Sequence, residues 1–493
     1  MASPRSSAAV LKRVQDGEKL SFFEQLSLVC RLSLPAMLAQ ISTIVMEYID
    51  AAMVGYLGAE ETASIGIVST TTWLFGGLVM AGSIGFTVQV AQKFGAKRDA
   101  EARNIMKEGL FTTFLYSILL SIIALLLSIR LPEWLTDDFS LYDDARIYFM
   151  IFMFALPIHQ INSVCSGMLQ SSGDMKTPGF LHIIACFLDV LFNALLIFPS
   201  DTLSLGPIPL PGADLGVSGA ALGTVLSEVV IAVFLLAIML KRSEKLKLRS
   251  DEKIRLNIDD IKTAAKISFP VAIEQFLMCG AYVAETFIVS PLGKIPIAAH
   301  SLAITAESLC YMPGFGIASA ATTLIGQSLG AKRRYLARRF AWLSVGLGMT
   351  FMACTGVLLY VFAPEMMTLL TPYTDIQELG VMILRIEAFA EPLYAAAIVC
   401  NGSFRGAGDT FVPSIMNFTS MWIVRLPFSW YLAYPMGMGI KGVWIAMATE
   451  LCVRGLIFIT RMKGKRWMKK ASGAPKLPEE SGDSVAADAS EHT

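Results

Sequence analysis

The sequence predicts an all-α integral membrane protein with twelve transmembrane helices in two pseudo-symmetric six-helix lobes. Three observations lead to this fold class. Apolar residues make up 54% of the chain and charged residues only 16%. Apolar runs of about 20 residues, each long enough to cross a ~30 Å hydrocarbon core as a helix, recur along the whole length. The two halves of the chain also repeat one another, residue for residue, over a long stretch.

The repeat keeps one unbroken register across many landmarks. The stretch that begins at Pro35 aligns without a gap on the stretch that begins at Pro270. Further aligned positions are Gln40 with Gln275, Asp50 with Glu285, Gly58 with Gly293, Gln92 with Gln327, Gly95 with Gly330, Pro157 with Pro392, and Pro178 with Pro413. A unit of this length is far longer than a solenoid repeat. Two similar membrane halves are typical of a transporter whose site lies between or inside them.

The chain divides into five segments by hydropathy. Residues 1–30 form a cytoplasmic tail with an interfacial amphipathic helix, 31–240 an N-lobe, 241–266 a polar linker, 267–462 a C-lobe, and 463–493 a cytoplasmic tail expected to be disordered. The expected spans are 33–56, 64–93, 107–131, 145–170, 178–199, 216–240, 267–291, 297–328, 338–363, 377–403, 411–435 and 439–460. A Pro- and Gly-rich insertion between spans five and six, residues 200–214, predicts a loop.

The distribution of charge predicts the orientation. Lys and Arg concentrate in the linker, both termini and the two GAKR loops that begin at Gly95 and Gly330, whereas the alternate loops are acidic. The positive-inside rule therefore places both termini in the cytoplasm of a multi-pass protein of the cell membrane. A net charge near zero gives no reason to expect a nucleic-acid partner, and we expect a monomer. The scattered cysteines form no CxxC pair, so we expect neither disulfides nor a zinc site.

Several motifs together resemble those of multidrug and toxic compound extrusion (MATE) transporters, prokaryotic branches in particular. They are the DAAMVGYLG stretch from Asp50, the twin QxxGAKR loops, AAH from Ala298, Met312-Pro313, FRGAGDTFVP from Phe404, Trp422 with Arg425-x-Pro427, and GIKGVWIAMATE from Gly439. The resemblance covers nearly the whole chain. It implies a secondary exporter that expels organic cations or amphiphilic drugs in exchange for inward-moving H⁺ or Na⁺, with no other cofactor and no enzymatic activity.

Acidic side chains inside the first and fifth spans predict a cation-coupling site. Glu47 and Asp50 lie three residues apart on one helix face, and Asp189 and Asn193 lie four apart. Ionisable groups within a bilayer are costly, so a cluster of carboxylates there is typical of an ion pathway. Several prokaryotic relatives bind their cation with an Asp in span one, an Asn and an Asp in span five, an Asn in span four and a Thr in span six.

The resemblance assigns that site to Asp50, Asp189, Asn193, Ser166 and Thr224, with Na⁺ or H⁺ at Asp50 and Asp189. This chain departs from the pattern in two places. The span-five pair is exchanged, with Asp189 where relatives carry Asn and Asn193 where they carry Asp. Ser166 replaces the span-four Asn. The resemblance also matches Pro35 to a proline at which the first span bends in some relatives, and a proline inside a helix permits such a bend.

The second lobe carries the candidate substrate site. Glu274 and Glu285 are eleven residues apart, almost three helical turns, so they share a face of span seven with Met278 and Tyr282 between them. Glu307 and Tyr311 share a face of span eight. Carboxylates neutralise a bulky cation, aromatic rings offer cation–π contact, and methionines adapt in shape. Many Na⁺-coupled relatives carry a Glu at the position of Met278, so that part of their site does not transfer.

Other intramembrane charges suggest structural ion pairs. Glu450 and Arg454 are four residues apart on the last span and can neutralise each other. Arg385, Glu387, Glu391 and Arg425 suggest ion pairs between helices of the C-lobe.

Three other functions compete with an exporter. A flippase for lipid-linked or amphiphilic cargo, as in the same superfamily, needs a cationic cavity. The spans hold more acids than bases, which favours a cationic cargo, but Arg385, Arg425 and Arg454 keep the flippase open. A membrane-embedded enzyme lacks support because the chain has no HExxH motif and no GxxxxGK[ST] nucleotide loop. Against a channel stand only the repeat and the resemblance.

Overall fold

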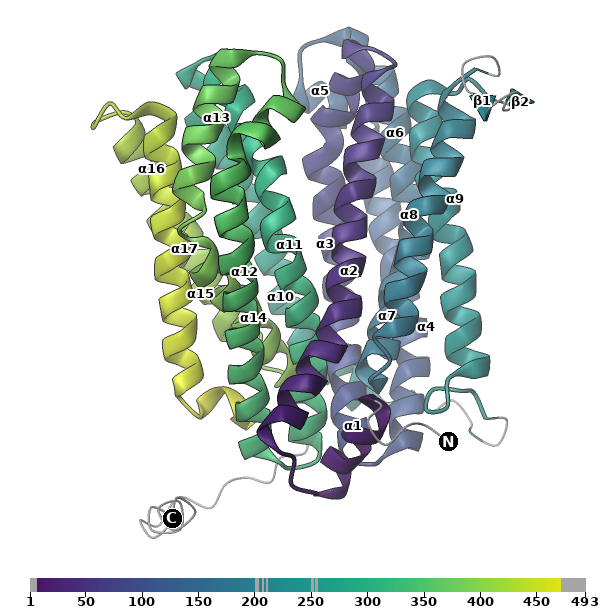
Figure 1. The fold of residues 1–493 in the computed structure, drawn as a ribbon. Coiled ribbons are helices and arrows are strands. Elements are labelled where there is room, and N and C mark those ends of the chain that lie inside the picture. Colours follow the sequence, from purple (N-terminus) through teal and green to yellow (C-terminus); the bar gives the residue numbers. More distant parts are fainter. Residues whose placement is uncertain are drawn as a thin grey trace.

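The structure is a computed structural model that describes residues 7–199, 204–205, 208–209, 212–249, 252 and 256–470. The expected disordered tail after residue 470 and much of the insertion at 200–214 lie outside the described residues. The described part is helical apart from one short antiparallel pair, β1 (Ser204–Leu205) with β2 (Ile208–Pro209). The helices run side by side in two groups, the N-lobe in purple to teal and the C-lobe in green to yellow (Figure 1).

The N-lobe begins with a short helix and contains six spans. Its elements are α1 (Ser7–Asp16), α2 (Phe22–Gly55), α3 (Ala59–Gly95), α4 (Asp99–Ser128), α5 (Leu131–Leu135), η1 (Phe139–Leu141), α6 (Tyr142–Phe154), α7 (Leu156–Ser172), α8 (Lys176–Ile197), α9 (Gly216–Ala237) and the π-helical η2 (Ile238–Arg242). The fourth span is the pair α6 and α7, bent by 45° just before Pro157. A proline at the start of α7 explains the break, because it cannot donate to the preceding turn.

The C-lobe repeats this order with two further interruptions. Its elements are α10 (Ile258–Val289), η3 (Ser290–Leu292), α11 (Lys294–Gly330), α12 (Arg334–Leu370), α13 (Thr374–Glu387), α14 (Glu391–Gly406), α15 (Phe411–Phe418), the π-helical η4 (Thr419–Arg425), α16 (Leu426–Ala433), α17 (Gly439–Lys463) and η5 (Arg466–Lys470). The tenth predicted span is α13 with α14, and the eleventh is α15, η4 and α16 in sequence.

The protein is a multi-pass membrane protein. Nine described helices are long and apolar enough to cross a membrane, and the bent pair α6–α7 makes ten. The interrupted spans ten and eleven complete the predicted twelve. Large apolar side chains are exposed along outer helices, for instance Phe111, Leu115 and Leu119 on α4 and Val357 and Leu358 on α12. Such exposure suits contact with lipid, whereas it is unfavourable in water.

Helix ends follow local sequence signals and differ in places from the predicted limits. Residues 22–32, expected to form an interfacial helix, are the first turns of α2. Ser21 caps α2, accepting from the Glu24 amide while the Glu24 carboxylate accepts from the Ser21 amide. Residues 7–16, expected to be tail, form α1. The predicted linker ends early because Asn257 caps α10, which begins at Ile258.

The lobes contact each other through repeat-related helices. The first span α2 packs along α11, and its repeat equivalent α10 packs along α3. These crossings are close: a Cβ added to Gly316 of α11 would lie 2.6 Å from the Met37 amide nitrogen, and one added to Gly85 of α3 would lie 2.2 Å from Ala264 O. Glycine is required at such positions because the backbones leave no room for a side chain.

Candidate functional site

The N-lobe acids form one small hydrogen-bonded group. Helix α2 carries Asp50, and α8 carries Asp189 and Asn193 one turn apart. The Asn193 side-chain amide donates to both carboxylates, 2.9 Å to Asp50 Oδ1 and 3.0 Å to Asp189 Oδ2. Asp189 and Asn193 are fully buried, while Asp50 is partly exposed. A single neutral donor thus bridges two like-charged groups.

This group has more acceptor atoms than donors. Asp189 Oδ1 and Asn193 Oδ1 are buried and have no hydrogen-bond partner among the described residues. Buried polar atoms without a partner are rare and call for an explanation, such as an ion that binds there. Gly223 on α9 makes room for the amide, because a Cβ there would lie only 2.0 Å from Asn193 Oδ1. The site therefore has capacity for a proton or a small cation.

The other predicted members surround this group at different distances. Thr224 lies beside the Asp189 carboxylate, and its hydroxyl also donates 3.3 Å to Ala220 O of its own helix. Ser166 contacts the ring of His182, at 3.3 Å, rather than either acid. Glu47 is exposed on α2, one turn before Asp50. The structure thus brings Asp50, Asp189, Asn193 and Thr224 together, with Ser166 and Glu47 at the edge.

The C-lobe contains a buried ion pair. Arg425, at the end of η4, donates from Nε to Glu285 Oε1 at 3.0 Å and from Nη2 to Glu285 Oε2 at 2.7 Å. Both side chains are almost completely buried. The two-pronged geometry matches the planar guanidinium to the carboxylate. Arg425 thus forms an ion pair between helices of the C-lobe, as expected, but its partner is Glu285 rather than Glu387 or Glu391.

Four further glutamates lie buried around this ion pair: Glu307 on α11, Glu387 on α13, Glu391 on α14 and Glu450 on α17. Glu450 pairs with Arg454 at 3.1 Å, as its spacing predicts, and accepts a hydrogen bond from Ser420. By contrast, neither carboxylate oxygen of Glu387 or Glu391 has a hydrogen-bond partner in the part of the chain that the structure describes. Among the described residues, no Lys or Arg forms an ion pair with Glu387 or Glu391.

Aromatic rings lie next to these acids. The rings of Tyr311 and Tyr394 are 5.5 Å apart, and the Arg454 guanidinium lies 5.5 Å from the centre of the Tyr394 ring. Tyr282, on α10, is partly exposed. Carboxylates and aromatic faces in one region suit a bulky cation.

The structure separates Glu274 from Glu285. Glu274 accepts from Ser414 at 2.6 Å and Asn417 at 2.7 Å, and Arg405 lies 3.6 Å away. These partners belong to α14 and α15 and lie three turns of α10 from Glu285. Met278, between the two acids, packs with Met421 and Trp422. Of the predicted substrate residues, Glu285, Glu307, Tyr282 and Tyr311 lie near the acidic group, whereas Glu274 and Met278 lie apart from it.

Comparison with known proteins decides the family. The MatE family model matches residues 35–195 and again residues 270–431, the two segments that the internal repeat defines. The chain belongs to the MatE family. It is therefore a MATE transporter rather than an enzyme, and the two-lobed fold of twelve spans that the sequence predicts is confirmed.

Relatives of this MATE transporter agree over most of its length. A "probable multidrug resistance protein NorM" of Thermotoga maritima is 26% identical over 444 residues, 90% of this chain and 93% of the relative. A solved MATE structure in the straight conformation superposes with a TM-score of 0.83 at 18% identity, covering 92% of this chain and 98% of the other. An outward-facing multidrug resistance MATE transporter gives a TM-score of 0.81 at 19% identity, covering 93% and 99%.

One contact in this MATE transporter, between His159 and Glu228, was not predicted from the sequence. His159 of α7 contacts Glu228 of α9, Nδ1 to Oε1 at 2.9 Å, and Asn162 donates 3.1 Å to the Glu228 carbonyl. The signal was an isolated acid inside the apolar sixth span. Glu387 and Glu391 were noticed but expected to pair with arginines. Pro35 lies inside an unbroken α2, where Gly179 of α8 approaches its carbonyl.

Proposed function

We propose that this protein is a secondary active exporter, an antiporter that moves organic cations or amphiphilic drugs out of the cell in exchange for H⁺ or Na⁺. It works as a monomer in the cell membrane with both termini in the cytoplasm. Supporting the export of drugs are the relatives named as multidrug resistance proteins and the acid-rich, aromatic interior of the C-lobe. The excess of Lys and Arg in the linker and the GAKR loops supports the orientation.

The N-lobe group carries the proposal for coupling. Asp50 and Asp189 share one bridging amide, and buried acceptors remain without donors. Two carboxylates that share a site are stabilised when they take up one positive charge. Between H⁺ and Na⁺ the arrangement favours H⁺, because the Asp50 and Asp189 carboxyls lie within hydrogen-bond reach of each other and can share one proton. Asp50 and Asp189 bind the ion, Asn193 orients them, and Thr224 lies beside the bound charge.

Glu228 and His159 extend this group along the N-lobe. Glu228 lies within electrostatic reach of both Asp189 and His182. Asp189 is eight residues from the end of α8, and His182 is only six from its start, so the polar face of this helix continues toward the opposite side of the membrane. A chain of carboxylate and imidazole groups is typical of a proton route. His159 and Glu228 therefore form a second titratable pair between the coupling acids and the cytoplasm.

The C-lobe supplies the substrate region. Glu307, Glu387 and Glu391 present negative charge, and Tyr282, Tyr311 and Tyr394 present aromatic surface. Antiport requires the ion and the substrate to prefer different conformations. Arg425 and Arg454 each pair with a glutamate, which leaves less positive charge in the C-lobe for a phosphate-bearing lipid. This balance favours a cationic cargo over the lipid-linked cargo of a flippase.

Efflux of ethidium from proteoliposomes tests the proposal. A pH gradient and a Na⁺ gradient are imposed separately on the wild type, Asp50→Asn and Asp189→Asn. We expect the pH gradient to drive export by the wild type, and both variants to lose gradient-driven export while keeping the folded state. Equal export by wild type and variants would remove coupling from the N-lobe. No export of any cation by the wild type would favour a lipid or a dedicated metabolite as the cargo.

A further inference from the structure

The twin QxxGAKR loops meet at one end of the molecule and are bonded to each other's lobe in a symmetric way. Gln92 of the N-lobe donates 3.2 Å to the carbonyl of Gly406 in the C-lobe. Gln327 of the C-lobe donates 2.8 Å to the carbonyl of Ser171 in the N-lobe. The repeat register that aligns Gln92 with Gln327 also aligns Ser171 with Gly406. Both glutamine side chains are buried, so each bond joins the lobes in a water-poor interface.

Glycines allow the two loops to touch through their backbones. A Cβ added to Gly95 would lie 2.0 Å from Gln327 O, and one added to Gly330 would lie 1.9 Å from Gln92 O. The ends of α3 and α11 therefore cross with no space for a side chain. Lys97 and Lys332, also related by the repeat, both have φ near +60°. Both copies of the QxxGAKR motif therefore take part in the same symmetric contact. This contact closes one end of the interface between the lobes.

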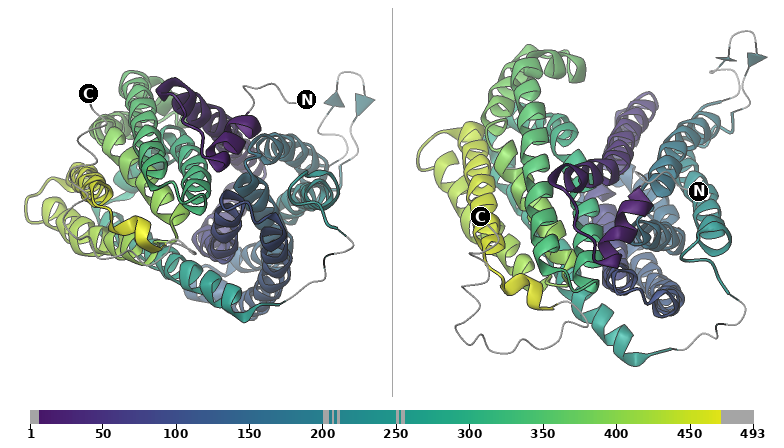
Figure 2. Two further views of the ribbon diagram at one scale, coloured as in Figure 1. Left: turned by 90° about the horizontal axis from the view of Figure 1, so that it is seen from below. Right: turned by 60° about the horizontal axis from the view of Figure 1, so that its bottom comes forward.

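Helix α1 covers this contact. Seen from below, it lies between the two lobes (Figure 2). Its buried residues Val10, Leu11 and Val14 pack in one cluster with residues of α2, α11 and α12 and with Met175. Leu11 fits against Gly173, where a Cβ would lie 2.4 Å from Leu11 Cδ1. α1 is therefore seated on both lobes at once rather than attached to one of them.

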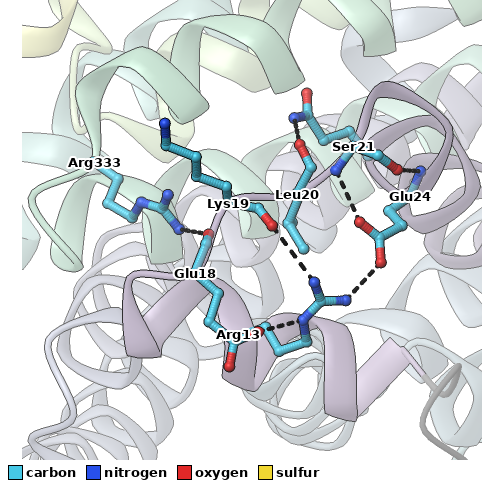
Figure 3. A network of polar contacts seen from close by, with 8 residues as sticks. Arg13, Glu18, Lys19, Leu20, Ser21, Glu24 and Arg333 are labelled. Atoms are coloured by element: carbon cyan, nitrogen blue, oxygen red, sulfur yellow. Dashed lines mark hydrogen bonds and ion pairs between the residues drawn. The ribbon is translucent and has the colours of Figure 1, made fainter.

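Each GAKR loop supplies one cation that holds α1. Lys97 of the N-lobe pairs with Asp16 at 2.5 Å. Arg333 of the C-lobe donates to the carbonyls of Val14 at 3.3 Å and Glu18 at 2.7 Å, where the end of the helix dipole is negative. Figure 3 shows the hydrogen bond from Arg333 to the Glu18 carbonyl and the ion pairs of Arg13 with Glu18 and Glu24. The hydrogen bond from the Lys97 ammonium lowers the pKa of Asp16, so Asp16 stays ionised at cytosolic pH and becomes neutral only in acid.

We propose that α1 and the twin QxxGAKR loops form a gate that holds the lobes together at the cytoplasmic end. Separation of the lobes there must break the two glutamine bonds and release α1 from Lys97 or from Arg333. The strength of the contacts between α1 and the two lobes sets the fraction of molecules that open to the cytoplasm. It therefore also sets the rate at which substrate enters from that side. The inference rests on the alternating access of the proposed function.

Distances between spin labels test the gate without any transport assay. Labels are placed in the full chain at Ala100 and Tyr335, exposed repeat-related positions at the starts of α4 and α12. Introduced as non-canonical amino acids, they leave the eight native cysteines in place. The wild type is compared with Leu11→Glu, which puts a charge into the apolar seat. Lys12→Glu introduces the same residue at an exposed position of the same helix and is the matched control.

We expect Leu11→Glu to enlarge the population with a long distance at least threefold and Lys12→Glu to leave it unchanged. Should Leu11→Glu fail to fold, Asp16→Lys should give the same increase, and the exchange Asp16→Lys with Lys97→Asp should reverse it. Gln92→Leu and Gln327→Leu should act alike, because the bonds are symmetric. Unchanged distances in Leu11→Glu and Asp16→Lys would overturn the gate. A shift in distance together with uncoupled or absent export would overturn only the proposed function.

Discussion

The two lobes differ in the partner that they give to the repeat-related acid of their first helix. Asp50 on α2 and Glu285 on α10 occupy the same place in the repeat. In the N-lobe the partner is a second acid, Asp189, reached through Asn193. In the C-lobe the partner is a base, Arg425, bonded directly. Arg425 lies at the end of the π-helix η4.

In the proposed function, this difference assigns a different ligand to each lobe. In the C-lobe pair, the Arg425 guanidinium neutralises the Glu285 carboxylate. The pair therefore needs no bound ion and can serve as a fixed part of the structure. Among the described residues, no Lys or Arg pairs with Asp50 or Asp189, so in the proposed function a bound ion balances their charge. The remaining acids of the C-lobe, Glu387 and Glu391, are spaced across two helices near aromatic rings, which suits a larger ligand.

The largest effect is expected from breaking the C-lobe pair. Arg425→Met leaves Glu285 charged and buried without a partner, and loss of one member of a buried ion pair costs about 3–5 kcal/mol. Thermal unfolding in detergent should show a clear loss of stability. The double variant Arg425→Met with Glu285→Gln should recover most of it.

Asp50→Asn is the counterpart in the N-lobe. Because it removes a like charge from the pair, it should leave thermal stability unchanged or raise it. A loss of stability in Asp50→Asn equal to that in Arg425→Met would show that the two pairs play the same structural role.

A second prediction concerns the room left for the bridging amide. In Gly223→Ala the new Cβ overlaps Asn193 Oδ1 and forces the side chain away from the acids. The rate of gradient-driven ethidium export should fall at least tenfold. A tenfold change corresponds to about 1.4 kcal/mol. Gly76→Ala is the control, since no atom lies within 4 Å of its added Cβ. Equal export by both variants would argue against a role for the Asn193 bridge.

A third prediction concerns the acids without partners in the C-lobe. Glu387→Gln should weaken binding of tetraphenylphosphonium about tenfold, because it removes one buried acid of the proposed substrate region. Binding of tetraphenylphosphonium by this variant should still depend on the coupling ion. Isothermal titration measures the affinity, and Glu378→Gln, an exposed glutamate on the same helix, is the control. If Glu387→Gln keeps its affinity for tetraphenylphosphonium but binding no longer depends on the coupling ion, the acids of the C-lobe bind the ion rather than the substrate.

The smallest effect is expected at the second pair of the N-lobe. Glu228→Gln should slow pH-driven export about threefold and leave the affinity for substrate unchanged, because it lengthens the proton route without removing the coupling acids. Transport rates at saturating substrate measure it. A complete loss of export would place Glu228 among the coupling groups themselves.

Much of the fold could be predicted from the sequence because it depends on simple periodicities. Hydrophobic length gave the spans, and the four-residue spacing of Asp189 and Asn193 placed them on one face, as it did for Glu450 and Arg454. Contacts that depend on an irregular backbone could not be predicted. The π-turn before Arg425 determines its partner, and the break between α13 and α14 leaves Glu387 and Glu391 unpaired. The docking of α1 was missed because a short amphipathic helix in a polar tail gives no sign of what it packs against.

Binding of tetraphenylphosphonium at acidic and alkaline pH tests the central claim most directly. If Asp50 and Asp189 bind the coupling proton, the proton and the substrate oppose each other, and by reciprocity the affinity must fall as the proton concentration rises. We predict this fall in the wild type, and an affinity independent of pH in Asp50→Asn and Asp189→Asn. A pH dependence that persists unchanged in both variants would contradict the account and move the coupling site out of the N-lobe.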